Sequence, residues 1–143
     1  MGIISIVQAD HILWLGRYTE RVYTTVQLYN QYFDDMIDGS EESYSEFCEK
    51  LDIPNIYTGV DDFMARYPFD TDNPDSIISN LYRAYDNAIV LRETIGSESL
   101  AYIQLAIYDW KKASQNPAPQ LETQKLIDHI MALRLWICCW ASG

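Results

Sequence analysis

The stretch HILWLGRYTERVYTTVQLYNQYFDDM (residues 11–36) indicates the fold class. Its apolar and small side chains recur at alternating intervals of three and four residues, which is the spacing of one face of an α-helix. That face consists of Ile12, Leu15, Thr19, Val22, Val26, Tyr29, Phe33 and Met36. We expect a long helix that begins near Ser5 or Asp10, ends before Gly39 and buries this face against other elements.

The rest of the chain repeats the helical spacing in further segments. A short stripe (Tyr44, Phe47, Leu51) follows Ser40, a suitable helix start, and VDDFMARYP (residues 60–68) indicates another short helix. Longer stripes are Ile77, Leu81, Ala84, Ala88, Leu91 and Ile95; then Leu100, Ile103, Ile107 and Trp110; and, after the loop QNPAPQ, Leu126, Ile130, Leu133, Ile137 and Trp140. No segment alternates like a strand. The sequence therefore predicts an all-α antiparallel bundle of about four long and one or two short helices, as one domain over residues 1–143.

The start of the helix behind TDNPDSII (residues 71–78) carries its own signals. Asn73 is expected as the N-cap, with Pro74 at the first helical position and Asp75 near the positive end of the helix dipole. Aspartates at 70, 72 and 75 also suggest calcium, but the glycine and the terminal glutamate of a calcium loop are missing. Capping is the favoured interpretation. Further on, Gly96 is expected to end this helix and Ser97 to cap the next one.

The charge balance excludes some classes of partner. The chain has 21 acidic and 10 basic residues and a net charge of −11, which disfavours nucleic acids and anionic lipid surfaces. It has no apolar run of about 18 residues and no signal-peptide pattern, so we expect neither a membrane span nor secretion. Its cysteines, Cys48, Cys138 and Cys139, lack a CxxC spacing and are expected as reduced thiols of a cytoplasmic protein.

An acidic segment runs from Asp34 to Asp52, with eight carboxylates and one lysine, Lys50. Such a segment is usually a solvated face. The alternative is a docking surface for a basic partner.

Sequence motifs for catalysis are missing. His11 and His129 are not preceded by the glutamate of a di-iron Glu-x-x-His motif, and three unspaced cysteines make no zinc site. There is no phosphate-binding glycine loop and no Gly-x-Ser-x-Gly turn. We therefore predict no catalytic residue, no metal and no cofactor, and the sequence favours a protein that is not itself an enzyme.

An arginine pattern remains to be explained. Trp14, Arg17 and Arg21 share one stripe of the first helix, continued by Thr25, about 110° away from the centre of its core face. In one interpretation the arginines pair with carboxylates of another helix. In the other, the stripe is an aromatic and arginine site for an anionic ligand or an acidic segment of a partner.

The helix after Pro74 has polar positions as well. Opposite its apolar face, the pattern predicts a solvated stripe formed by Ser76, Asn80, Arg83 and Asn87. Arg92 falls about 50° from the centre of the apolar stripe, where a cation needs a partner. We expect a carboxylate there, from Glu98 or from the first helix.

Two segments, ADHILWLGRYTERV and DNPDSIISNLYRAYDNAIVLRETIGSES, carry a family resemblance. The first is similar to the Trp-Leu-Gly-Arg-Tyr-x-Glu-Arg run that opens chains of the bacterial alpha-E family, and the second is similar to that family's second signature. The similarity covers residues 9–21 and 72–98. The family's signature falls on Trp14, Gly16, Arg17, Glu20, Arg21, Asn73, Pro74, Arg83, Asn87, Arg92 and Glu98.

The resemblance implies an all-helical domain that accompanies ATP-grasp peptide-ligase-like and transglutaminase-like proteins. Family members are typically about twice as long and repeat the Gly-Arg-x-x-Glu-Arg pattern, which occurs once here. His11 replaces a usual Asn, and Leu100 and Gln104 replace a usual Trp and Asn. The chain thus resembles a half-length, single-repeat member, which predicts a homodimer through an isologous contact.

Three functions are compatible with these patterns. The favoured one is a non-catalytic helical interaction module of a peptide-ligase-like or peptide-modifying system, with an ATP-grasp-like protein as partner. The others are an enzyme subunit that binds an anionic peptide or nucleotide group through its arginines, and a purely structural homo-oligomer. The candidate binding residues are Trp14, Arg17, Arg21, Arg83, Asn87 and Arg92. The candidates for structural ion pairs are Glu20 and Glu98.

Overall fold

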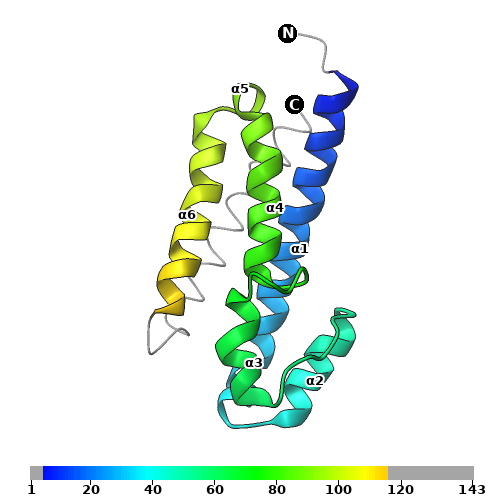
Figure 1. The fold of residues 1–143 in the computed structure, drawn as a ribbon, viewed down its shortest axis with the longest axis vertical. Helices are drawn as coiled ribbons and strands as arrows, with labels where there is room; N and C mark the ends of the chain where they lie inside the picture. Colours follow the sequence, from blue (N-terminus) through cyan, green and yellow to red (C-terminus); the bar gives the residue numbers. More distant parts are fainter. Residues whose placement is uncertain (1–4, 116–143) are drawn as a thin grey trace.

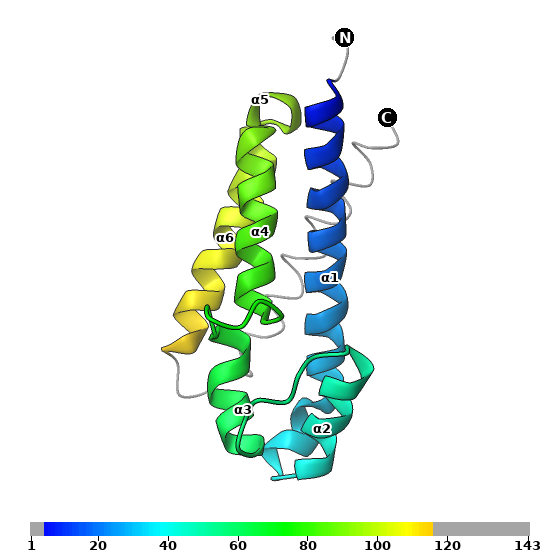
Figure 2. The ribbon, with the colours of Figure 1, turned by 45° about the vertical axis from the view of Figure 1, so that its right-hand side comes forward.

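Three long helices dominate residues 5–115, the part of the chain that a computed structural model describes. They are α1 (Ile6–Ile37), α4 (Ile77–Val90) and α6 (Ser97–Ser114). The shorter elements are α2 (Glu41–Lys50), α3 (Val60–Arg66), the 3₁₀ turn η1 (Tyr67–Phe69) and α5 (Arg92–Ile95). In both Figure 1 and Figure 2, α4 lies between α1 and α6 and runs antiparallel to both.

The predicted all-α antiparallel bundle is confirmed, because the described residues contain helices and no strand. The helix expected after the QNPAPQ loop, with its stripe from Leu126 to Trp140, lies outside the described residues. None of the helices within residues 5–115 is both long and apolar enough to cross a membrane.

The predicted bounds of α1 agree with the structure. Ser5 is the N-cap, and its hydroxyl accepts a hydrogen bond from the Gln8 amide while the Gln8 side chain accepts one from the Ser5 amide. This reciprocal capping box satisfies two amides that have no partner within the helix. At the other end the chain leaves α1 through Gly39, whose φ of +88° favours glycine. Of the predicted face, all but the half-buried Ile12 are buried.

An aromatic cluster joins α1 to the shorter elements at the lower end of Figure 1. Phe63, on α3, lies at its centre and is fully buried. Its ring lies with centroid distances between 4.8 and 6.3 Å from the rings of Tyr67, Tyr44, Tyr57, Phe47 and Tyr29. Because these rings come from α1, α2, α3, η1 and the loop before α3, the cluster fixes how α2 and α3 fold back onto α1.

The acidic segment lies on the surface, and the eight carboxylates between Asp34 and Asp52 are all exposed, as both a solvated face and a docking surface require. One of them also has a structural role. The N-cap of α3 is Gly59, which has no side chain, and Glu41 Oε2 instead accepts the hydrogen bond from the Val60 amide at 3.1 Å. A carboxylate is favourable there because it faces the positive end of the helix dipole.

The start of α4 differs from the prediction that Asn73 is its N-cap. The helix begins at Ile77, and Ser76 is the N-cap, with its hydroxyl accepting a hydrogen bond from the Ser79 amide at 3.2 Å. Asn73 Oδ1 accepts from the Asp75 amide at 2.9 Å and so closes a separate turn before the helix. Pro74 consequently lies in that turn. Asn and Ser compete for the same capping role, and the local pattern does not decide between them.

Replacing Ser76 with alanine is expected to lower the free energy of unfolding by about 1–2 kcal/mol. The Ser76 side chain is fully buried, and its hydroxyl also donates to the Asp70 carbonyl at 2.6 Å, so alanine removes both hydrogen bonds. The measurement is urea unfolding followed by circular dichroism. Ser45→Ala, at an exposed position of α2, is the control and is expected to change stability by less than about 0.5 kcal/mol. If Ser76→Ala and Ser45→Ala lower the free energy of unfolding equally, Ser76 is not the N-cap of α4.

The two sides of α4 agree with the pattern to different degrees. Its apolar stripe from Ile77 to Ile95 is buried throughout. The stripe predicted to be solvated is not uniform, because Ser76 and Asn80 are buried whereas Arg83 and Asn87 are half-buried. The predicted solvated face is therefore wrong at its first two positions. Asn80 can be buried because its amide donates to the Ser76 carbonyl at 2.9 Å.

A break in the helix separates α4 from α5 at Leu91. As predicted, Gly96 ends this region, with a φ of +86°. The predicted cap of the next helix is shifted by one residue, because Gly96 also occupies the N-cap of α6 and Ser97 is its first residue. The predicted apolar face of α6 packs on the core, with Ile103, Ile107 and Trp110 buried and Leu100 partly buried.

Candidate functional site

One flank of α1 meets one flank of α4 along a strip of surface that we call the α1–α4 seam. It consists of His11, Trp14, Arg17, Tyr18 and Arg21 from α1, Asp75 before α4, and Arg83 and Asn87 from α4. The seam unites five of the six binding residues predicted from sequence. Two residues of the α4 stripe that the pattern predicts to face solvent contact α1 instead: Arg83 lies over Tyr18, and Asn87 bonds His11.

The centre of the seam is a pair of stacked rings, each with a guanidinium group over it. The rings of Trp14 and Tyr18 stack at a centroid distance of 5.7 Å and an interplanar angle of 27°. The guanidinium carbon of Arg17 lies 5.4 Å from the centre of the Trp14 ring, and that of Arg83 lies 6.0 Å from the centre of the Tyr18 ring. Both distances are within the range of cation–π attraction. Each ring therefore attracts one of the two guanidinium groups and limits its freedom to move.

These two guanidinium groups have hydrogen-bonding capacity left over. Arg83 Nη1 donates to the Pro74 carbonyl at 2.6 Å. Within residues 5–115, neither Arg17 nor Arg83 forms an ion pair with a carboxylate. A guanidinium carries five N–H donors in a planar fork that matches a carboxylate or phosphate. Arg17 and Arg83 are thus suited to bind an anionic group.

Arg21 differs from these two because it is paired. Its Nη2 lies 3.4 Å from Asp75 Oδ1, and the side chains of Arg21 and Asp75 are 44% and 33% exposed. For Arg21, the interpretation as an ion pair between elements is correct. Asp75 itself is anchored by Tyr67, whose hydroxyl donates to the Asp75 carbonyl at 3.0 Å. Burial raises the pKa of Tyr67, so the hydroxyl stays a donor across the physiological range.

The upper end of the seam is closed by a hydrogen bond between the helices. Asn87 Nδ2 donates to the Arg83 carbonyl at 2.8 Å, which directs Asn87 Oδ1 towards His11 Nδ1 at 2.9 Å. His11 Nδ1 is therefore the donor. The seam also contains His11, Tyr18 and Asp75, which the sequence pattern did not indicate as binding residues. A signal for His11 and Tyr18 exists, because they lie three residues before and four residues after Trp14, on the same face of α1.

Arg92 lies apart from the seam, and the prediction that it is paired with a carboxylate is wrong for the described residues. It begins α5 and is exposed. The helical extrapolation fails because the chain leaves the axis of α4 at Leu91. Glu98, its predicted partner, is exposed on α6, and Glu20 lies on the exposed side of α1.

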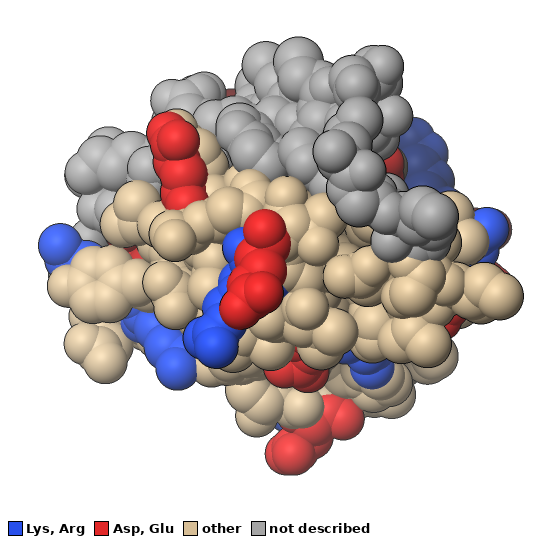
Figure 3. All heavy atoms as spheres, turned by 90° about the horizontal axis from the view of Figure 1, so that it is seen from above, with Lys and Arg blue, Asp and Glu red and all other residues tan. Residues whose placement is uncertain are grey.

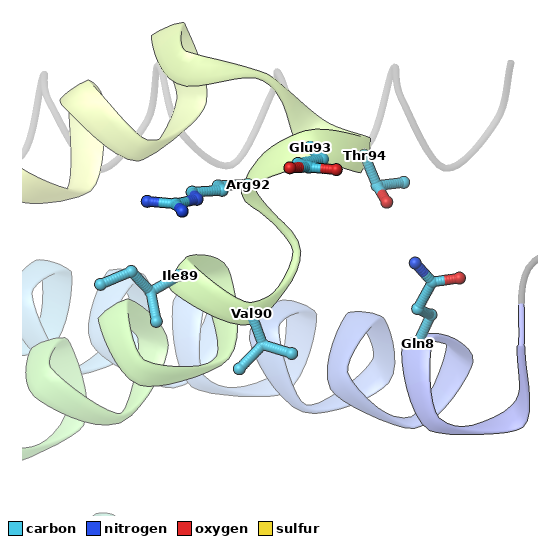
Figure 4. Close-up of a pocket in the computed structure, with 6 residues that line it drawn as sticks. All are labelled: Gln8, Ile89, Val90, Arg92, Glu93 and Thr94. Atoms are coloured by element: carbon cyan, nitrogen blue, oxygen red, sulfur yellow. The ribbon is translucent and has the colours of Figure 1, made fainter.

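A shallow hollow of about 490 Å³ lies at the end of the bundle that carries α5. Arg92 lines it together with Gln8, Ile89, Val90, Glu93 and Thr94, and Figure 4 shows these side chains arranged around an open space between α1, α4 and α5. Figure 3 views this end of the molecule from above. Most of the surface of the described residues there is uncharged, around a small group of acidic and basic side chains.

Cys48 and Tyr57, two titratable groups outside the seam, have raised pKa values. Burial raises the pKa of the Cys48 thiol to about 11, so the thiol stays protonated and unreactive at neutral pH. Burial likewise raises the pKa of Tyr57 to about 12. No group of three or more His, Cys, Asp or Glu side chains in this part of the chain could hold a metal ion. His129, Cys138 and Cys139 lie outside the described residues.

Comparison with known proteins gives one match. Residues 8–135 match the Alpha-E family, described as a predicted alpha-helical domain with a conserved ER motif. No curated protein and no solved structure matches the chain. Its single Glu-Arg dipeptide is Glu20–Arg21, so the arginine of that motif is the one that pairs with Asp75. Because the match spans nearly the whole chain, the protein belongs to the Alpha-E family.

Proposed function

We propose that this chain is a non-catalytic helical interaction module whose α1–α4 seam binds an acidic segment of a partner in a peptide-ligase-like or peptide-modifying system. One observation carries the proposal: Arg17 and Arg83 are held on the faces of stacked rings, without a carboxylate partner among the described residues. The stack reduces the side-chain freedom that binding has to remove, which favours affinity. Guanidinium groups bind carboxylates with strong, charge-assisted hydrogen bonds.

The net charge of −11 does not prevent the seam from attracting an anion. Arg21 precedes Asp34, the first carboxylate of the acidic segment, by 13 residues of one helix, which is about 20 Å at 1.5 Å per residue. At physiological ionic strength the screening length is about 8 Å. The acidic segment and the seam are therefore electrostatically separate, and within the seam three arginines face one carboxylate.

A nucleotide group is the second candidate ligand. The side chain of Trp14 is 40% exposed, and an exposed indole next to arginines can stack on a base while the arginines hold a phosphate. This ligand corresponds to the alternative function, in which the chain is a subunit of an enzyme. An acidic peptide and ATP, used as separate probes, distinguish the two candidate ligands.

Fluorescence anisotropy with a labelled peptide of alternating Glu and Gly tests the seam. The variant Arg17→Gln/Arg83→Gln is expected to bind this peptide at least about tenfold more weakly than wild type, because it loses two charge-assisted contacts. The matched control is Arg92→Gln/Lys112→Gln, which makes the same change of net charge at exposed positions outside the seam. The control is expected to bind within about twofold of wild type, because its cations do not contact the ligand.

The outcomes of the binding experiment distinguish an acidic segment of a partner from a nucleotide as the ligand of the seam. If the two double variants bind the peptide equally well, the seam is not the binding surface. If ATP binds in place of the peptide and depends on Arg17 and Arg83, the nucleotide function is the correct one.

Affinity capture from a cell lysate tests the partner class. An ATP-grasp-like or transglutaminase-like protein that wild type retains and the folded Arg17→Gln/Arg83→Gln variant loses supports the proposed system.

A further inference from the structure

A carboxylate of the chain itself occupies part of the seam. Asp75 lies against Arg21 at its lower end, and the carbonyl of the preceding residue, Pro74, accepts a hydrogen bond from Arg83. The turn at Pro74–Asp75 therefore contacts two of the three arginines, and it places an anionic group where a carboxylate of a ligand would otherwise reach Arg21.

The main chain at Asp75 is held on both sides by buried or mostly buried groups. Its amide donates to Asn73 Oδ1 at 2.9 Å, and its carbonyl accepts from the Tyr67 hydroxyl at 3.0 Å. The Asn73 amide group in turn donates to the Tyr57 hydroxyl at 2.9 Å. Through these hydrogen bonds, residues of the core hold the backbone of the turn in place. The position of Asp75 is thus built into the fold and does not depend on its ion pair.

The ion pair itself is weak. It has one N–O contact of 3.4 Å rather than the two parallel contacts of a bidentate pair, and both side chains are partly exposed. Exposed pairs of this kind contribute little to stability. A carboxylate of a ligand can therefore compete with Asp75 for Arg21, although the negative charge of Asp75 repels it.

We propose that Asp75 is an internal competitor that determines which acidic ligands the seam accepts. This inference rests on the proposed function of the seam. Asp75 occupies Arg21 and repels carboxylates from the lower end, so a ligand with one carboxylate is held by Arg17 and Arg83 alone. Only a ligand with several carboxylates, bound by Arg17 and Arg83 at the centre of the seam, also displaces Asp75 from Arg21. Asp75 thereby raises the charge density that a partner needs.

The test compares Asp75→Asn with Asp72→Asn in the same peptide-binding experiment. Both substitutions remove one negative charge, but the exposed Asp72 lies three residues away from Asp75 and forms no ion pair within residues 5–115. Asp75→Asn is expected to bind the alternating Glu and Gly peptide about tenfold more tightly than wild type, with a steeper salt dependence. Asp72→Asn is expected to stay within about twofold of wild type. Circular dichroism checks that both variants are folded.

The double variant Arg21→Gln/Asp75→Asn completes a double-mutant cycle, which shows whether the effect of Asp75 on binding depends on Arg21. If the gain comes from the release of Arg21, this double variant loses it and binds like wild type. The inference is overturned if Asp75→Asn binds no more tightly than Asp72→Asn, or if its gain persists without Arg21. Should wild type bind through Arg17 and Arg83 while Asp75→Asn shows no gain, the proposed function stands and this inference alone fails. Should no variant bind the peptide, both fail.

Discussion

Phe63→Ala is expected to lower the free energy of unfolding by about 3–5 kcal/mol, the range of a large aromatic side chain removed from a packed core. Phe63 is 0% exposed and its ring packs against five other rings from α1, α2, η1 and the loop before α3. Alanine leaves a cavity among these rigid side chains, which cannot collapse to fill it. The measurement is urea unfolding, followed by circular dichroism and by tyrosine fluorescence.

Phe63→Leu is the matched variant, because leucine fills most of the volume and loses the ring contacts. We expect it to destabilise the protein by less than half as much as alanine. The exposed Ile56→Ala is the control for a loss of apolar atoms outside the cluster, with an expected effect below about 0.5 kcal/mol. If Phe63→Ala and Ile56→Ala are equally mild, the cluster is not the packing centre of this end of the bundle.

Trp110→Ala is expected to have an effect of similar size, about 3–5 kcal/mol. Trp110 is 3% exposed, its ring lies 5.9 Å from that of Phe69, and its indole Nε1–H donates to the Pro68 carbonyl at 2.6 Å. This residue therefore joins α6 to η1 through both packing and a buried hydrogen bond. Thermal unfolding and urea unfolding both measure the loss.

Trp110→Phe separates the hydrogen bond from the packing. Phenylalanine keeps most of the apolar contact, but it leaves the buried Pro68 carbonyl without its donor, which is expected to cost about 1–3 kcal/mol. A phenylalanine variant as stable as wild type would show that the hydrogen bond adds nothing. If Trp110→Ala were as stable as Trp110→Phe, the packing of the ring would add nothing to stability.

Much of the fold was predictable because helical periodicity is a local property. The buried face of α1 follows from the spacing of residues within one helix, and local signals predicted its end before Gly39 and a start near Ser5 or Asp10, of which Ser5 is the N-cap. The errors lie where two local signals compete. Asn73 and Ser76 are both good caps, and the choice of Ser76 depends on the acceptor that Asp70 offers to its hydroxyl. Leu91 ends α4 although the apolar spacing continues to Ile95.

The candidate site was predictable only in part. The spacing of Trp14, Arg17 and Arg21 places them on one stripe, and the structure agrees. The spacing did not indicate that Arg21 pairs with Asp75 whereas Arg17 has no carboxylate partner within residues 5–115, since Asp75 comes from another part of the chain. For Arg92, an extrapolation along one helix axis gave the wrong surroundings, because the axis changes before that residue.

The sequence by itself determined the all-α class, the apolar faces that α1, α4 and α6 bury, and the position of Arg17 and Arg21 on one stripe of α1. These properties depend on residues three and four positions apart, whose geometry the helix fixes. Only the tertiary structure decided that Tyr18 and His11 of α1 meet Arg83 and Asn87 of α4, and that Arg21 meets Asp75, 54 residues later in the chain. The rotation and position of one helix against another follow from the packing of the whole core, which local periodicity does not encode.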